Sequence, residues 1–129
     1  MVAFFALDEI PTVVGGQLSF DGSEGYGIEF DSYHNQEYND SPNPHIALIH
    51  GEASNHLVSV DDERVRTNQW HTADITVDGD RITAKIDGDA VIDFTGYIDR
   101  TNRSMYFAAS TGASNDNHYI RSVVLTELP

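Results

Sequence analysis

The sequence predicts a single all-β domain, an antiparallel β-sandwich of the jelly-roll type. Short apolar runs recur along the chain, with turns rich in Gly, Pro, Asn and Asp between them. Several runs alternate apolar and polar residues, and none has the 3.6-residue period of an amphipathic helix. At 129 residues the chain is long enough to bury one core. We therefore treat residues 1–129 as one domain.

The first strand is expected over residues 2–7, where VAFFAL is apolar throughout. An acidic pair followed by Pro11 ends this run. Turns are then expected at Gly15-Gly16 and at Asp21-Gly22, on either side of a short apolar segment.

The next strand begins at Gly25 and carries acidic residues on one face. Glu29 and Asp31 share this face, because successive side chains of a strand point to opposite sides, while Ile28 and Phe30 take the other. A loop over residues 35–44 follows, in which two prolines prevent regular pairing. Further strands are expected at 45–50 and 56–60.

The clearest strand signals lie in residues 70–94. The runs WHTADITV, RITAKID and AVIDF are separated by turns at Asp78-Gly79-Asp80 and at Gly88-Asp89, which predicts a meander of three strands. Two more strands are expected at 105–110 and 119–128, with a loop of Gly, Ser and Asn between them.

The acidic strand and the loop after it have the composition of a metal site. Two like charges on one strand face repel unless a cation lies over them. Asn35, Asp40 and His45 follow with further oxygen and nitrogen donors. Carboxylates, an amide and a carbonyl suit calcium, and an imidazole added to carboxylates suits a transition metal such as manganese. The alternative is a solvated acidic face.

The spacing of these residues, E-x-D-x-Y-x-N-x4-D-x4-H, resembles the metal-binding signature of the legume-type (L-type) lectins. Similar segments occur in the same order at AFF, GGQLSF, WHTADITVDGDRITAKIDG and AASTGASNDNHYIRSVVL. The resemblance implies a concanavalin A-like fold and two bound ions. It assigns manganese or another transition metal to Glu29, Asp31, Asp40 and His45. It assigns calcium to Asp31, Tyr33, Asn35 and Asp40.

The resemblance also implies a carbohydrate-binding site. Its expected members are Gly15, Gly16, Asn35, Thr111, Asn115, Asp116 and His118. The first part of the family domain, which includes an Asp that binds sugar hydroxyls, has no counterpart here, so we expect a domain truncated relative to full-length members. Open sheet edges recruit other chains, and we therefore expect a homo-oligomer.

Composition narrows the possible partners. The formal net charge of -14 argues against nucleic acid and anionic membrane surfaces. No apolar stretch reaches the ~20 residues of a membrane span, and the chain does not begin with a signal-peptide pattern. There are no cysteines, so disulfides and thiolate metal ligands are excluded. The lectin resemblance implies an extracellular or cell-surface location.

We expect a metal-dependent, non-catalytic carbohydrate-binding module. Some hydrolases on this fold use a Glu-x-Asp-x-x-Glu strand, but His34 stands where the second Glu would be, and no nucleophile motif is present. Of the six histidines only His45 has a metal-ligand context. His118 lies in the loop expected to meet a ligand, and the other four, His34, His50, His56 and His71, are expected to be ordinary polar residues. The alternatives are a metal-stabilised structural or adhesion sandwich without sugar binding, and a glycoside hydrolase.

Overall fold

The protein folds into strands joined by short connections. The computed structural model describes residues 1–7, 20, 22–99, 101, 104–111 and 116–129. Their strands are β1 (Val2–Leu7), β2 (Tyr26–Asp31), β3 (His45–His50), β4 (Glu52–Asp61), β5 (Ala73–Asp78), β6 (Arg81–Ile86), β7 (Asp89–Thr95) and β8 (Ser104–Ala108). The described connections include the short 3-10 helices η2 (Gln36–Tyr38) and η3 (Glu63–Arg66).

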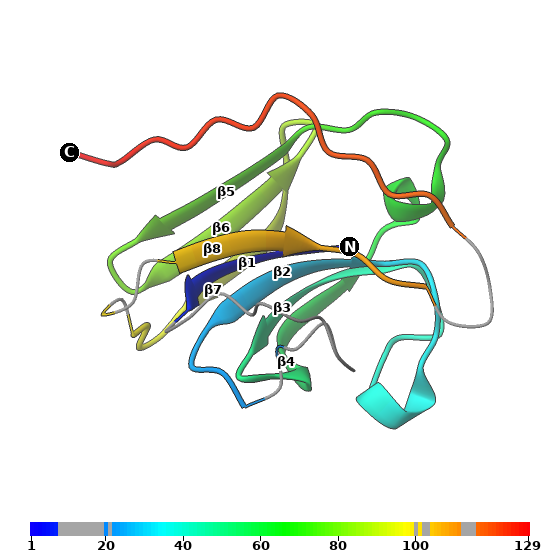
Figure 1. Cartoon of the computed structure of the whole chain (residues 1–129), viewed down its shortest axis with the longest axis horizontal. Helices are drawn as coiled ribbons and strands as arrows, with labels where there is room; N and C mark the ends of the chain where they lie inside the picture. Colours follow the sequence, from blue (N-terminus) through cyan, green and yellow to red (C-terminus); the bar gives the residue numbers. More distant parts are fainter. Residues whose placement is uncertain (8–19, 21, 100, 102–103, 112–115) are drawn as a thin grey trace.

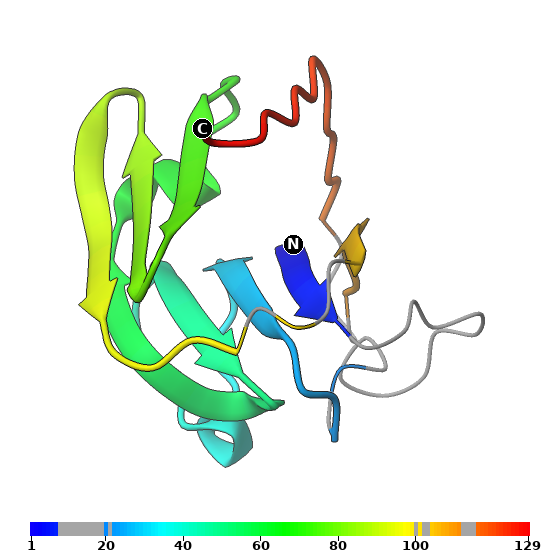
Figure 2. The ribbon, with the colours of Figure 1, turned by 90° about the vertical axis from the view of Figure 1, so that its left-hand side faces the viewer.

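The strands form two antiparallel sheets. One has five strands in the order β4-β3-β2-β1-β8, and the other has three in the order β5-β6-β7 (Figure 1). The smaller sheet lies across β3 and β4, so the two sheets face each other (Figure 2). The predicted all-β sandwich is confirmed.

The main core lies between the two sheets. Alternation places Ile82, Ala84 and Ile86 of β6 inward, where they pack against Ile28 of β2 and Leu48 of β3. These side chains are all at most 3% exposed. The predicted meander supplies one wall of this core, with the register that its Asp-Gly turns imply.

A second apolar cluster covers the opposite face of the five-stranded sheet. Val2 and Phe4 of β1 pack there with Phe20, Ala47 and Ile49. Gly27 lies under this cluster, and a Cβ atom at that position would be 2.8 Å from a Val2 methyl carbon. This outer face is the one that carries Glu29, because Glu29 is paired with Ala47 across β2 and β3.

Four predicted strands need correction, and the first is β5, which begins at Ala73 rather than at Trp70. Strand β4 begins at Glu52 rather than His56, and β8 spans 104–108 rather than 105–110. Residues 119–128 form no strand: their backbone is unpaired, and Ser122 has a φ of 55°, which breaks an extended run. Apolar alternation alone does not make a strand where no neighbouring strand offers a hydrogen-bonding edge.

The unpaired C-terminal segment carries much of the exposed apolar surface. It leaves β8, crosses the open side of the sandwich and ends near β5 (Figure 2). Its large exposed apolar side chains are Tyr119, Ile120, Val123, Val124, Leu125 and Leu128. No helix within the described ranges is long and apolar enough to span a membrane.

We expect this segment to bind a second copy of the chain, because an extended apolar segment beside open sheet edges recruits another strand. Light scattering should give a dimer or a larger assembly. Replacing Val124 and Leu125 together with Lys should shift the mass to that of a monomer, while the neighbouring Thr126→Lys should not. A parent chain that is monomeric at high concentration would contradict the prediction.

Candidate metal centre

Three strands place donors on the outer face of the five-stranded sheet. Directly opposed residues of antiparallel strands share a face. Glu29 opposes Ala47, and His45 lies two residues before Ala47 on the same strand, so both side chains point outward. His56 opposes Ile49, another outward residue. Glu29, His45 and His56 are therefore brought together from β2, β3 and β4.

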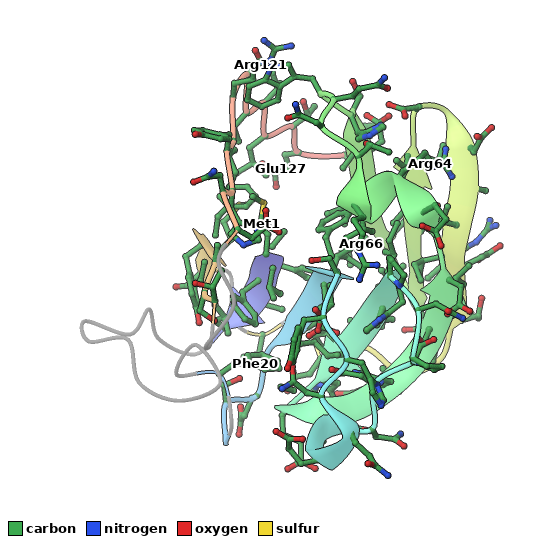
Figure 3. The ribbon with its side chains drawn as sticks, turned by 90° about the vertical axis from the view of Figure 1, so that its right-hand side faces the viewer. Met1, Phe20, Arg64, Arg66, Arg121 and Glu127 are labelled. Atoms are coloured by element: carbon green, nitrogen blue, oxygen red, sulfur yellow. The ribbon has the colours of Figure 1, made fainter. Side chains whose placement is uncertain are left out.

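The loop between β2 and β3 adds Asp40. This loop contains η2, which ends at Asn39 in the left-handed conformation with a φ of 64°. The Asn35 amide donates to Asp40 Oδ2 at 2.8 Å, and the Asp40 amide donates to the Asn35 carbonyl at 3.4 Å. These bonds close the loop and bring the Asp40 carboxylate over the sheet. Arg66 reaches from η3 and donates to the Ser32 carbonyl, which holds the end of the acidic strand (Figure 3).

The four side chains form a compact group. His45 Nε2 lies 3.4 Å from Glu29 Oε1 and 3.9 Å from Asp40 Oδ1. His56 Nε2 lies 3.5 Å and 3.7 Å from the same two oxygens. One donor atom from each residue lies within 4.8 Å of all the others. Two carboxylates and two imidazoles thus surround a common point.

Donor atoms of this group lack hydrogen-bond partners. Glu29 Oε1, His45 Nε2 and His56 Nε2 are all buried and unpartnered. His45 Nδ1 donates to the Asn43 carbonyl at 3.1 Å, which leaves Nε2 as the nitrogen available to a metal. Buried polar atoms without partners are costly, and a bound cation would satisfy all three. The residues therefore fit a metal ion.

The same contacts shift the pKa values of the group. Burial alone would lower the pKa of His45, but the Glu29 carboxylate, the Asn43 carbonyl and the Asp31 carboxylate together outweigh burial and raise that pKa to about 9. Glu29 also raises the pKa of His56. Burial opposes the charged form of Glu29, yet the two histidines lower its pKa. In the metal-free protein, the Glu29 carboxylate therefore favours the protonated forms of His45 and His56.

We expect metal binding to strengthen as the pH rises from about 6 to about 9, since the ion must displace the proton from His45. Each displaced proton changes the apparent affinity about tenfold per pH unit. In the metal-free protein the effect of pH on stability has the opposite sign. The raised pKa of His45 stabilises the fold below pH 6.5, the ordinary pKa of a histidine, and this stabilisation is lost as the pH rises through about 9. Calorimetry in buffers of different ionisation enthalpy would count the protons. An affinity that does not change with pH would contradict a site containing His45.

Comparison with known families adds to this geometry. A family model described as a 3-keto-alpha-glucoside-1,2-lyase-like domain matches residues 13–120. The chain belongs to this family. Its fold is of the concanavalin A-like lectin and glucanase type, as expected, while the narrower resemblance to L-type lectins stays a prediction. No curated protein and no solved structure matches the chain.

The structure brings together part of the predicted metal set. Glu29, Asp40 and His45 lie in the four-residue group. Asp31 pairs with His45 across the strands, but its Oδ1 accepts from the Tyr33 amide at 2.8 Å, and it is not a member of that group. The Tyr33 side chain is exposed, and the Asn35 side chain donates to Glu37 at 3.4 Å.

His56, expected to be an ordinary polar residue, is the member that sequence reasoning missed. Alternate residues of a regular strand share a face, so Val60 and Val58 on the core face would predict that residue 56 lies there too. A register shift in β4 separates the pair Leu48 and Val58 from the pair Ile49 and His56. Leu57 and Val58 consequently both pack toward the core, and His56 turns outward. The adjacent apolar residues Leu57 and Val58 interrupt strict alternation, and this interruption was the sign in the sequence that the strand is irregular here.

Only some of the predicted sugar-site residues lie among the residues that the structure describes. Gly15, Gly16 and Asn115 lie outside the described residues. Thr111 is exposed, and Ser32 donates to Asp116 at 3.5 Å, which places this part of the C-terminal segment beside the end of β2. His118 is half-buried, its Nε2 lacks a hydrogen-bond partner, and it lies within electrostatic range of Asp31.

Proposed function

We propose that this domain is a non-catalytic carbohydrate-binding module organised by a bound metal ion. The observation that carries the proposal is the burial of all four side chains of the metal group. The side chains of His45, His56, Asp40 and Glu29 are only 0%, 6%, 3% and 11% exposed. Burial of all four donor side chains keeps an ion held there away from solvent and substrate, which suits a structural rather than a catalytic metal site. The ion's role would be to fix the loop that ends at Asp40.

The donor set indicates the class of metal. Two imidazole nitrogens and two carboxylate oxygens suit manganese or another transition metal, because calcium prefers oxygen ligands throughout. The L-type lectin resemblance supports a calcium ion beside it, held by Asp31, the Tyr33 carbonyl, Asn35 and Asp40. Asn35 and Asp40 are already joined by two hydrogen bonds, one of them to the Asp40 carboxylate, so ions at these positions would hold the loop rigid.

A rigid loop suits the recognition of sugars. Affinity rises when a site does not have to be ordered on binding. Asn35 would offer its amide to sugar hydroxyls, and Asp116 and His118 from the neighbouring segment would offer an acceptor and an imidazole. The proposed carbohydrate-binding site also includes Gly15, Gly16, Thr111 and Asn115.

A glycan array with and without manganese and calcium tests the proposal. We expect metal-dependent hits that Asn35→Ala weakens about tenfold or more, since it removes a hydrogen-bonding group from the site. Gln36→Ala is the matched control, because Gln36 is the exposed neighbour in η2 and belongs to no proposed site. Metal-independent hits, or no hits from a metal-loaded protein, would count against carbohydrate recognition at this loop.

The family match favours a second candidate function, a lyase acting on 3-keto-α-glucosides. A ketone at C3 acidifies the hydrogen on C2. A base removes that proton, the electron pair forms the C1–C2 double bond, and the C1–O bond breaks as the alcohol leaves with a proton. His118 is a suitable base, because burial lowers its pKa and keeps its unpartnered Nε2 unprotonated at neutral pH.

Turnover of a 3-keto-α-glucoside, followed by the ultraviolet absorbance of the conjugated enone, distinguishes the two functions. The non-catalytic proposal expects no absorbance change above the uncatalysed rate. Turnover that falls at least a hundredfold in His118→Ala, but not in His34→Ala, would replace it with the lyase.

A further inference from the structure

The molecule has a cleft at the opposite end of β2 and β3 from the metal centre. The pair Asp31 and His45 marks the metal end of these strands, and the pair Tyr26 and His50 marks the other end. The cleft opens at Tyr26 and His50 and has a volume of about 390 Å³. This volume is in the range of small-molecule sites, roughly 300 to 1,000 Å³.

Hydrogen bonds and stacking shape the inner wall of the cleft. The Tyr26 ring is buried and stacks on His50, with 4.2 Å between ring centroids and 15° between planes. His50 Nδ1 donates to the Gly25 carbonyl at 2.9 Å. The Tyr26 hydroxyl accepts from the Asp99 amide at 3.3 Å, which ties the connection after β7 to β2. This wall is preformed.

The lining of the cleft combines apolar residues with acidic ones. Leu57 of β4 and Phe94 of β7 form an apolar floor. Glu24 and Asp99 add acidic residues to the lining, and Asp99 Oδ1 accepts from the Thr101 amide at 3.0 Å. Tyr97 joins them with a side chain that is 84% exposed, and such exposure is uncommon for a large aromatic residue.

This combination matches the two-sided chemistry of a pyranose ring. The faces of the ring carry C–H groups that pack on an aromatic plane or an apolar floor, while its edge carries hydroxyls that donate to carboxylates. His50 adds a further polar contact through Nε2, because Nδ1 is already bonded to Gly25. A phosphorylated or carboxylated sugar is disfavoured, because Glu24 and Asp99 would repel it.

We propose that the cleft formed by Glu24, Tyr26, His50, Leu57, Tyr97 and Asp99 binds a neutral pyranose sugar, independently of the metal centre. This second site lies at the far end of the sheet from Asn35 and shares no residue with the metal group. It would give one domain two points of attachment to a glycan, and two linked contacts raise avidity without strengthening either one.

Titration of the full chain with methyl α-glucoside and maltose, followed by NMR of backbone amides, tests the proposal. We expect saturable shifts at residues 23–26, 50, 57 and 94–99, both with and without chelator. Tyr97→Ala should weaken binding about tenfold, and Tyr97→Phe should retain most of it because the ring remains. Tyr119→Ala, which truncates an exposed tyrosine outside the cleft and outside the metal group, is the matched control.

The same titration distinguishes this proposal from the proposed function. Binding that survives chelator and Asn35→Ala belongs to the cleft, even where the array shows no metal-dependent hits. The cleft proposal is overturned if no saturable shift appears at high millimolar sugar. It is also overturned if Tyr97→Ala binds as the parent does, or if tetramethylammonium binds more tightly than sugar, which would indicate a site for cations.

Discussion

Adding manganese to chelator-treated protein is expected to raise its melting temperature by roughly 10 °C, and His56→Ala is expected to abolish the rise. A ligand that binds only the native state stabilises it by RT ln(1 + [L]/Kd), or about 2.7 kcal/mol at a hundredfold excess over Kd. For a domain of this size, each kcal/mol corresponds to a few degrees. His56 Nε2 lies 3.5 Å from Glu29 and 3.7 Å from Asp40, so its removal opens one side of the group.

The control for this experiment is His50→Ala. His50 is a half-buried histidine of β3, but it stacks on Tyr26 on the opposite face of the sheet. This variant should melt at a lower temperature and still respond fully to manganese. If His56→Ala responds as the parent does, the ion is bound elsewhere; if the parent itself does not respond, the buried group is not a metal site.

Leu48→Ala is expected to lower the free energy of unfolding by about 2 to 5 kcal/mol, the usual range for a buried Leu or Ile cut back to Ala. Leu48 is fully buried on β3, an inner strand of the five-stranded sheet, where it opposes Ile28 on β2 and Val58 on β4 and faces the three-stranded sheet. The cavity would lie between the two sheets, where little can move to fill it.

Urea unfolding of the parent and the variant measures this loss. Thr76→Ala, an exposed substitution on β5, serves as the control and should change stability by less than about 0.5 kcal/mol. The m-value should stay unchanged, because the surface exposed on unfolding is nearly the same. A loss below about 1 kcal/mol would mean that the two sheets do not pack as a single core at this position.

Local patterns predicted the elements whose partners are close in the sequence. The meander followed from alternation and Asp-Gly turns, and β3 from a single apolar run. Strand β4 was only partly predicted, because its register shift depends on packing against β3. Residues 119–128 have a strand's composition, yet a strand also needs a partner edge, which composition does not reveal.

The metal centre was likewise predicted only in part. Glu29, Asp40 and His45 are linked by one strand, one loop and the start of the next strand, so their spacing was informative. His56 joins them only because β4 folds back on β3 with an irregular register. The cleft at Tyr26 and His50 was not predicted at all, since its residues come from four separated stretches of chain.

The pairing of β1 with β8 affects how the chain folds. Val2 pairs with Ala108, whereas β2, β3 and β4, like β5, β6 and β7, pair with strands next to them in the sequence. Short loops close with little loss of entropy, and a loop of about a hundred residues closes at greater cost. Two local groups of strands can therefore form early and independently. Joining the first strand to the last is the slow, high-contact-order step that completes the larger sheet.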